Sequence, residues 1–161
     1  MLGRMYEREN CSAARALEIV GERWSLLIIR TAVFTDRTRF SEFERRLGIA
    51  PNILAKRLEG FVADGLMELR SPADGSAGRE YVLTAKGREL GLIIIALTEW
   101  GDRWAAPDGA PILFEHRECG GLVHVTTACD RCGQSPDMSE VTAVAGPGAN
   151  EQQSRLPQHR T

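Results

Sequence analysis

The sequence lacks the features that mark a membrane protein or an exported protein. Its longest apolar run, LGLIIIAL at residues 90–97, is far shorter than the roughly 20 residues that a helix needs to cross a bilayer. The first ten residues, MLGRMYEREN, are charged and carry no apolar core, so they do not resemble a signal peptide. We therefore expect a cytoplasmic protein that makes no contact with a membrane.

Histidine is scarce, and its distribution argues against catalysis. The three histidines are His116, His124 and His159, all in the last third of the chain. The sequence offers no Ser/His/Asp or Cys/His arrangement of the kind that activates a nucleophile, and no glycine-rich loop for phosphate groups. We predict that the protein is not an enzyme.

The chain also lacks a large excess of charge of one sign, which excludes a general polyanion binder. Its net charge is only −2, but the charges are unevenly distributed. Residues 36–57 carry a local charge of +3, from six basic and three acidic side chains. Basic charge concentrated on one element is typical of a DNA-binding surface. The basic residues of this segment are Arg37, Arg39, Arg45, Arg46, Lys56 and Arg57.

Two helices are predicted ahead of this basic segment. The first begins near Cys11 or Ser12, where a serine cap precedes good helix formers. The second covers WSLLIIRTAVF at residues 24–34 and is apolar around most of its circumference. Such a helix is usually buried, so we expect it to support the centre of the domain.

A helix-turn-helix is predicted within the basic segment. FSEFERRL at residues 40–47 reads as the first helix, with Ser41 and Glu44 as a loose capping box. In the turn LGIAP, Gly48 permits a left-handed backbone and Pro51 suits the first position of a second helix. The second helix is then the candidate recognition helix.

A wing is predicted after the recognition helix. Residues 66–70 and 80–84 read as two strands, and the segment SPADGSAG between them has the composition of a turn. Ser76 or Arg79, near this tip, can reach a neighbouring DNA groove. The expected fold class is mainly α (α+β), a winged helix-turn-helix with dimerisation helices and a small cysteine-rich C-terminal appendage.

One face of the helix opened by Pro51 is predicted to meet DNA. Asn52 and Lys56 lie where side chains reach base edges, whereas Arg39 and Arg57 are assigned to phosphates. The free N–H groups that follow Pro51 also favour a phosphate. The full set of candidate DNA-contacting residues is Arg39, Ser41, Pro51, Asn52, Ala55, Lys56, Arg57, Ser76 and Arg79.

A long helix over residues 85–104 closes the predicted domain. Leu90, Ile94, Leu97 and Trp104 are assigned to one apolar stripe, and further apolar residues widen it. Two interpretations remain open: a packed core helix, or a helix that pairs with a second protomer. Dimerisation would match the two-fold symmetry of palindromic operators.

The C-terminal appendage contains a candidate metal site. His116-x2-Cys119-Gly and Cys129-x2-Cys132-Gly are separated by nine residues, and two such turns can surround a structural zinc ion with four ligands. His124 is an alternative fourth ligand. Free thiols and a redox-active dithiol or disulfide are the competing interpretations.

A further cysteine, Cys11, stands alone just before the first helix. A thiol near a helix N-terminus can have a lowered pKa and can react with oxidants, which makes Cys11 the redox candidate. The alternative is a small buried residue at a helix entry.

Residues 11–104 resemble the HxlR-type winged helix regulators, relatives of the MarR group, in the segments CSAARALEIVGERWSLLIIR, RFSEFERRLGIAPNILAKRLEGFVADGLMELR, REYVLTAKGREL and EWGDRW. The resemblance implies a homodimeric transcription factor that dimerises through its N-terminal and long C-terminal helices. In several members the cysteine that matches Cys11 senses oxidants, quinones or aldehydes. This chain departs from the family pattern at Ser12, where proline commonly follows the cysteine, and in the extension over residues 105–161.

The sequence therefore predicts three regions: a DNA-binding and dimerisation domain over residues 1–106, a Cys/His-rich appendage over 107–145, and a disordered tail over 146–161. The expected function is that of a homodimeric, sequence-specific regulator that binds double-stranded DNA and responds to thiol chemistry or to a small effector. The alternative is a winged helix that binds another protein and does not read DNA.

Overall fold

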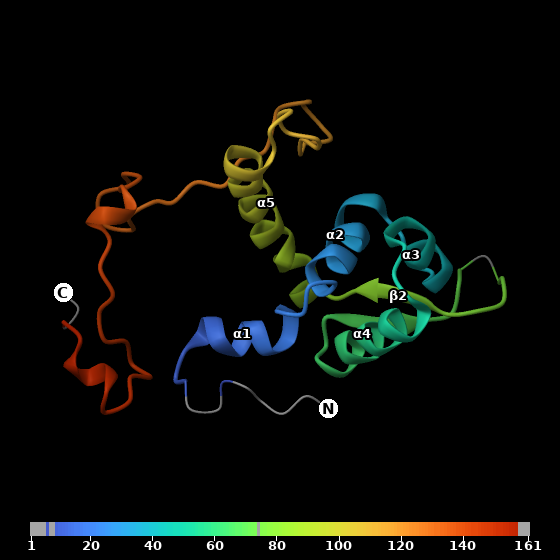
Figure 1. Cartoon of the computed structure of the whole chain (residues 1–161), viewed down its shortest axis with the longest axis horizontal. Coiled ribbons are helices and arrows are strands. Elements are labelled where there is room, and N and C mark those ends of the chain that lie inside the picture. Colours follow the sequence, from blue (N-terminus) through green and yellow to red (C-terminus); the bar gives the residue numbers. More distant parts are fainter. Residues whose placement is uncertain (1–5, 7–8, 74, 158–161) are drawn as a thin grey trace.

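The structure, a computed structural model, describes residues 6, 9–73 and 75–157 (Figure 1). Its helices and strands follow the order predicted for a winged helix-turn-helix. Over the described residues they are α1 (Ser12–Val20), α2 (Ser25–Thr35), α3 (Phe40–Leu47), α4 (Pro51–Ala63), β1 (Met67–Arg70), β2 (Glu80–Leu83), α5 (Ala85–Ala105) and the short 3-10 helices η1 (Met138–Glu140) and η2 (Gln153–Arg155). None of the described helices has the length and apolar character needed to cross a membrane.

The core is built around α2. Ile28 and Ile29 are completely buried at its centre, and Phe43 from α3 and Leu58 from α4 are buried with them. Helix α2 contacts α3, α5 and β2, so it joins the helix-turn-helix to the rest of the domain. This confirms that the apolar segment over residues 24–34 supports the centre of the fold.

The turn between α3 and α4 follows from two residues. Gly48 ends α3 in the left-handed region, with φ +60°, and its N–H donates to the carbonyl of Glu44 at 2.9 Å. Pro51 occupies the first turn of α4, where its missing N–H and fixed φ cost nothing. The angle between the two helices is thus set by local backbone chemistry.

The wing is a two-stranded antiparallel sheet that pairs Met67 with Leu83 and Arg70 with Glu80. The chain just before α3 pairs with β2 over a short stretch. The Thr38 carbonyl accepts the Tyr81 N–H at 2.7 Å, and Arg39 forms a bridge with Glu80. Because of this pairing, the wing is attached directly to the start of α3.

Helix α5 packs closely on one side and leaves its other side exposed. Gly87 lies so near β1 that a Cβ atom there would stand 2.1 Å from the Leu66 carbonyl oxygen, which requires glycine. Ile94 and Ile95 are buried on the same side. The predicted stripe of Leu90, Ile94, Leu97 and Trp104 does lie along one side of the helix, but its burial changes along the length, because Ile94 is buried whereas Leu97 and Trp104 are exposed.

The exposed stripe of α5 consists of Ile93, Leu97, Trp100 and Trp104. These residues are spaced by four, three and four positions, which places them on one line along the helix. Helix α5 extends away from the rest of the domain (Figure 1), and all four side chains of the stripe are exposed.

The chain after α5 turns back onto the domain and then leads away from it. Phe114 packs against Phe34 of α2 with ring centroids 4.5 Å apart, and a bridge between Glu115 and Leu122 closes a small hairpin. The following segment crosses the top of α5 and descends beside α1 (Figure 1).

The last described residues lie against the start of α1. Within the tail expected over residues 146–161, residues 146–157 contain η2 and contact the residue before Cys11. Asn10 Nδ2 donates to the Gly148 carbonyl at 2.8 Å and to Gln153 Oε1 at 2.6 Å. Residues 158–161 lie outside the described part of the chain.

Candidate nucleic-acid interface

The outer face of α4 is the one expected from the sequence. Leu54, Leu58 and Phe61 are buried on its inner face, whereas Asn52 and Lys56 are exposed on the outer face. Pro51 is exposed at its N-terminus, and Ala55 is half-buried beside Lys56. The N-terminus and the outer face of α4 are therefore accessible enough for the helix to enter a DNA groove.

Arg57 occupies a different position from its neighbour Lys56. Its side chain is only 21% exposed, and its Nε lies 3.9 Å from a carboxylate oxygen of Glu22, in the turn between α1 and α2. The buried Nε makes no hydrogen bond within the described residues. Successive helical residues point about 100° apart, so Arg57 faces the α1–α2 turn while Lys56 faces outward.

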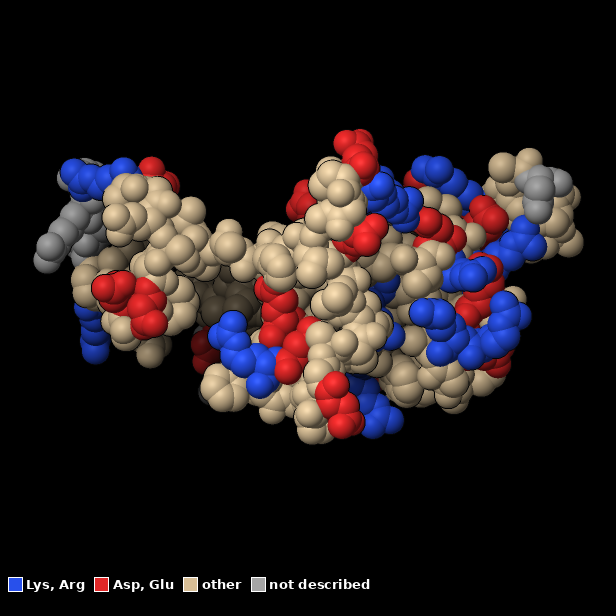
Figure 2. Space-filling view, turned by 90° about the horizontal axis from the view of Figure 1, so that it is seen from above, with Lys and Arg blue, Asp and Glu red and all other residues tan. Residues whose placement is uncertain are grey.

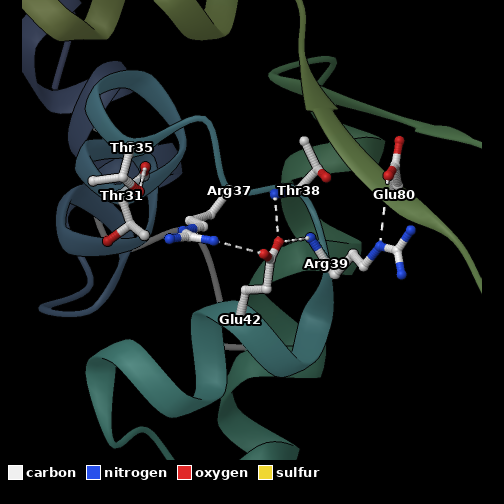
Figure 3. Close-up of polar contacts among 7 residues, drawn as sticks. All are labelled: Thr31, Thr35, Arg37, Thr38, Arg39, Glu42 and Glu80. Atoms are coloured by element: carbon white, nitrogen blue, oxygen red, sulfur yellow. Dashed lines mark hydrogen bonds and ion pairs between the residues drawn. The ribbon is translucent and has the colours of Figure 1, made fainter. Parts of the chain in front are cut away.

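The start of α3 is fixed by the carboxylate of Glu42. This carboxylate accepts hydrogen bonds from the backbone N–H groups of Thr38 and Arg39 at 3.1 and 3.0 Å, and from Arg37 Nη1 at 3.0 Å (Figure 3). The N-cap is therefore Arg39, and the acidic residue at N3 is Glu42 rather than the predicted Glu44. The N–H of Arg39 is the largest of these causes that lower the pKa of Glu42.

Arg39 connects this N-cap to the wing. Its Nη2 donates to Ser76 Oγ at 2.6 Å, and its Nε lies 3.6 Å from Glu80 Oε1. Two of the residues predicted to contact DNA, Arg39 and Ser76, are thus brought into contact across 37 residues of sequence. Figure 3 shows the Arg39 side chain reaching from the start of α3 to β2, where Glu80 lies. Arg79 and Ser41 are exposed nearby in the chain.

Basic side chains gather at the end of the molecule that carries α3 and the wing (Figure 2). Arg45 and Arg46 occupy the last turn of α3 and are exposed. They contribute to the local positive charge of residues 36–57 and stand immediately before the turn of the helix-turn-helix.

The cysteines and histidines of the appendage lie in two pairs. His116 Nδ1 is 3.2 Å from Cys119 Sγ, and Cys129 and Cys132 stand three positions apart in one turn, in which the Gly133 N–H donates to the Cys129 carbonyl at 2.8 Å. The N–H groups of Cys132 and Arg131, with the Cys132 thiol, lower the pKa of Cys129. Across the described residues, no three such side chains form a single metal-binding group.

His124, the alternative ligand, is held elsewhere. Its Nδ1 is 2.8 Å from Glu99 Oε1 of α5, and the Val125 N–H donates to the other oxygen of Glu99 at 3.3 Å.

Cys11 is a half-buried free thiol immediately before α1. Its carbonyl accepts the Arg15 N–H at 3.1 Å, and Arg15 Nη2 donates to Asn10 Oδ1 at 2.7 Å. Since Asn10 also binds the C-terminal segment, the backbone that positions Cys11 is linked to the last described residues.

A cavity of about 800 Å³ lies between α2 and the appendage. Val33, Phe34 and Phe114 form part of its apolar wall, and Arg30 and Arg46 stand at its edge. This size and this mixed lining are typical of a site for a small organic molecule.

A helix-turn-helix joined to a two-stranded wing, with an open helix face and basic side chains on the same end, defines a winged helix-turn-helix protein of the transcription-regulator class. Residues 19–109 match the HxlR-like helix-turn-helix family. The chain belongs to this family, which consists of DNA-binding regulators.

The chain is similar to several known proteins over most of its length. It is 40% identical over 141 residues to the uncharacterised HTH-type transcriptional regulator Rv3095 of Mycobacterium tuberculosis, over 87% of this chain and 89% of that protein. The crystal structure of PA1607, described as a candidate transcription factor, superimposes with a TM-score of 0.78 at 34% identity, over 88% of this chain and 99% of that one. The redox regulator HypR in its reduced form superimposes with a TM-score of 0.51 at 26% identity, over 58% of this chain and 92% of that one.

Glu42→Gln tests the N-cap of α3. The lowered pKa of Glu42 means that its ionised form stabilises the fold above the ordinary glutamate pKa of about 4.3, and that this stabilisation is lost as the pH falls through the lowered value. At pH 7 the variant should unfold with a free energy about 1 kcal/mol smaller than wild type. Denaturant titrations from neutral to acidic pH should show this difference shrinking.

Glu44→Gln is the matched control, because it makes the same charge change on α3 away from the N-cap. An equal loss of stability in both variants would contradict the assignment of Glu42 as the N-cap partner.

Proposed function

We propose that the protein is a homodimeric, sequence-specific DNA-binding transcription regulator, without enzymatic activity, whose DNA affinity responds to thiol oxidation. The single observation that supports DNA reading best is the open face of α4. Asn52 and Lys56 are exposed on this face, and basic side chains of α3 and the wing lie at the same end of the molecule. A helix placed in the major groove needs base-reading side chains in the middle and phosphate ligands on both sides.

The roles of individual residues follow from their positions. Lys56 and Asn52 are proposed to reach base edges, since both are long enough and neither is buried. Arg39 is proposed to bind a phosphate at the base of the wing, where Ser76 and Glu80 orient it. Arg57 is the weaker candidate, because it is turned toward Glu22, and its removal is expected to affect stability as well as binding.

Lys56→Ala is expected to weaken binding about tenfold to the DNA sequence recovered from a random pool by selection with the wild-type protein. The loss corresponds to one good base or phosphate contact. Fluorescence anisotropy at several salt concentrations measures both the affinity and its salt dependence, and the melting temperature should stay unchanged.

Arg155→Ala is the matched control for charge. Arg155 is exposed in η2, outside the helix-turn-helix, the wing and the groove between α1 and α5. Equal weakening by both substitutions would remove α4 from the interface. If the wild-type protein recovers no DNA sequence from the pool, the protein-binding winged helix is the better interpretation.

A second copy of the chain is the proposed partner of the exposed stripe on α5. Trp100 and Trp104 are 61% and 70% exposed. Two large apolar side chains exposed together on one helix face are typical of a surface that binds a partner. A groove of about 530 Å³ between α1 and α5, lined by Ile19 and Leu92 among others, adjoins the stripe. A two-fold axis there would present two α4 helices to half-sites on one face of DNA.

Trp100→Glu is expected to raise the dissociation constant of the dimer by at least about 30-fold, because a buried tryptophan is a common energetic centre of an interface. Sedimentation velocity over a range of protein concentrations measures the change. Leu113→Glu is the control, since Leu113 is 62% exposed but lies outside the stripe. A wild-type protein that stays monomeric at every concentration would contradict the dimer.

Cys11 is the proposed oxidant-sensitive thiol. It is a half-buried free thiol at the entry to α1, and the later residues of α1 line the proposed dimer groove. The similarity to HypR, whose structures are described as those of a redox regulator in reduced and oxidised forms, supports a thiol switch in this chain as well. A chemical change at Cys11 would act on α1 and, through it, on the spacing of the two DNA-binding helices.

A mild oxidant is expected to change the operator affinity of the wild-type protein severalfold and to leave that of Cys11→Ser unchanged. Anisotropy with and without oxidant, followed by reduction, measures the effect and its reversibility. If Cys11→Ser responds as strongly as wild type, the sensor lies among the C-terminal thiols instead.

A further inference from the structure

Two turns of the appendage have the same backbone conformation. In the first, the His116 carbonyl accepts the Gly120 N–H at 2.9 Å, and the His116 N–H donates to the Gly121 carbonyl at 2.8 Å. In the second, the Cys129 carbonyl accepts the Gly133 N–H at 2.8 Å, and the Cys129 N–H donates to the Gln134 carbonyl at 2.8 Å.

The glycines confirm the repeat. Gly120 and Gly133 both have φ +71°, a left-handed conformation that favours glycine at the end of a tight turn. The chain therefore builds the same turn twice, 13 residues apart, although the two sequences share only the cysteine and the glycine at the fourth and fifth positions.

Each turn places two metal-binding side chains together at its first and fourth positions. His116 Nδ1 lies 3.2 Å from Cys119 Sγ, close to the roughly 3.5 Å that separates nitrogen and sulfur ligands of a tetrahedral zinc ion with the usual bond lengths. In the second turn, Cys129 and Cys132 occupy the same two positions of the same backbone turn as His116 and Cys119 do in the first.

We propose that the two turns together bind one zinc ion through His116, Cys119, Cys129 and Cys132. His124 is not one of the proposed ligands, because Glu99 already holds its ring against α5. On binding, the three thiols release their protons to water and His116 binds as the neutral imidazole. Four protein ligands leave no open position, so the zinc is structural.

Closure of this site requires a change in the segment between the turns. In the structure the two pairs stand at the two ends of this segment, which runs across the end of α5 (Figure 1). Its middle, at His124 and Val125, is the part fixed to Glu99. The proposed site requires this segment to bend so that both turns lie on the same side. The nine residues from Gly120 to Ala128 are long enough for such a hairpin.

The test is the metal content of the full chain, purified without chelators under reducing conditions. Mass spectrometry of the metal should find one zinc per chain in the wild-type protein and in Cys11→Ser, the matched control that removes a thiol outside the turns. The double variant Cys129→Ser with Cys132→Ser should lose the zinc. Absence of zinc in the wild type, or an equal loss in Cys11→Ser, overturns the proposal.

Cobalt(II) provides a second measurement that does not depend on how well the double variant folds. Added to the metal-free wild-type protein, Co²⁺ should give the visible absorption of a tetrahedral site and the ultraviolet charge-transfer bands of three thiolates. His116→Cys keeps a ligand at this position, so it should still bind one ion, with a fourth thiolate added to the charge-transfer intensity. An octahedral cobalt spectrum in the wild type, or an unchanged spectrum in His116→Cys, contradicts the proposed ligand set.

Discussion

The fold depends on the burial of α2, a helix that is apolar around most of its circumference. Ile28 and Ile29 are removed from water completely, and the contacts that α2 makes with α3, α5 and β2 provide the cover. The helix-turn-helix and the wing are therefore held by one shared core rather than by contacts with each other alone. Gly87 and Gly91 allow α5 to approach this core closely enough to complete it.

The polar contacts at the surface refine this arrangement and connect it to the proposed function. Glu42 fixes the start of α3 by accepting hydrogen bonds from the N–H groups of Thr38 and Arg39. The Arg39 side chain binds Ser76 and lies beside Glu80, so it links the start of α3 to the wing. A DNA-binding surface made of separate elements needs such links, because each element must keep its distance from the others when it meets the duplex. Arg39 therefore connects α3 to the wing and is also a candidate phosphate ligand.

Much of the geometry of the candidate interface could be predicted from the sequence. The contacts that could not be predicted join residues that are far apart in the chain. Gly48 and Pro51 determine their turn through local backbone preferences, and the exposure of Asn52 and Lys56 follows from helical spacing. The sequence assigns Arg57 to a phosphate, whereas in the structure Arg57 is turned toward Glu22, which lies 35 positions earlier in the chain. Long-range ion pairs of this kind leave no periodic signal in the sequence.

The sequence by itself determined the order of helices and strands, the helix-turn-helix, the wing and the paired turns of the appendage, because short-range turn chemistry and hydrophobic spacing specify each of them. Only the tertiary structure decided which side of α5 is buried, which glutamate caps α3 and where the C-terminal segment lies. The physical reason is that periodicity places a residue on a face but does not say what packs against that face. Asn10 and Gln153 meet across 143 positions of sequence, and neither carries a local pattern that points to the other.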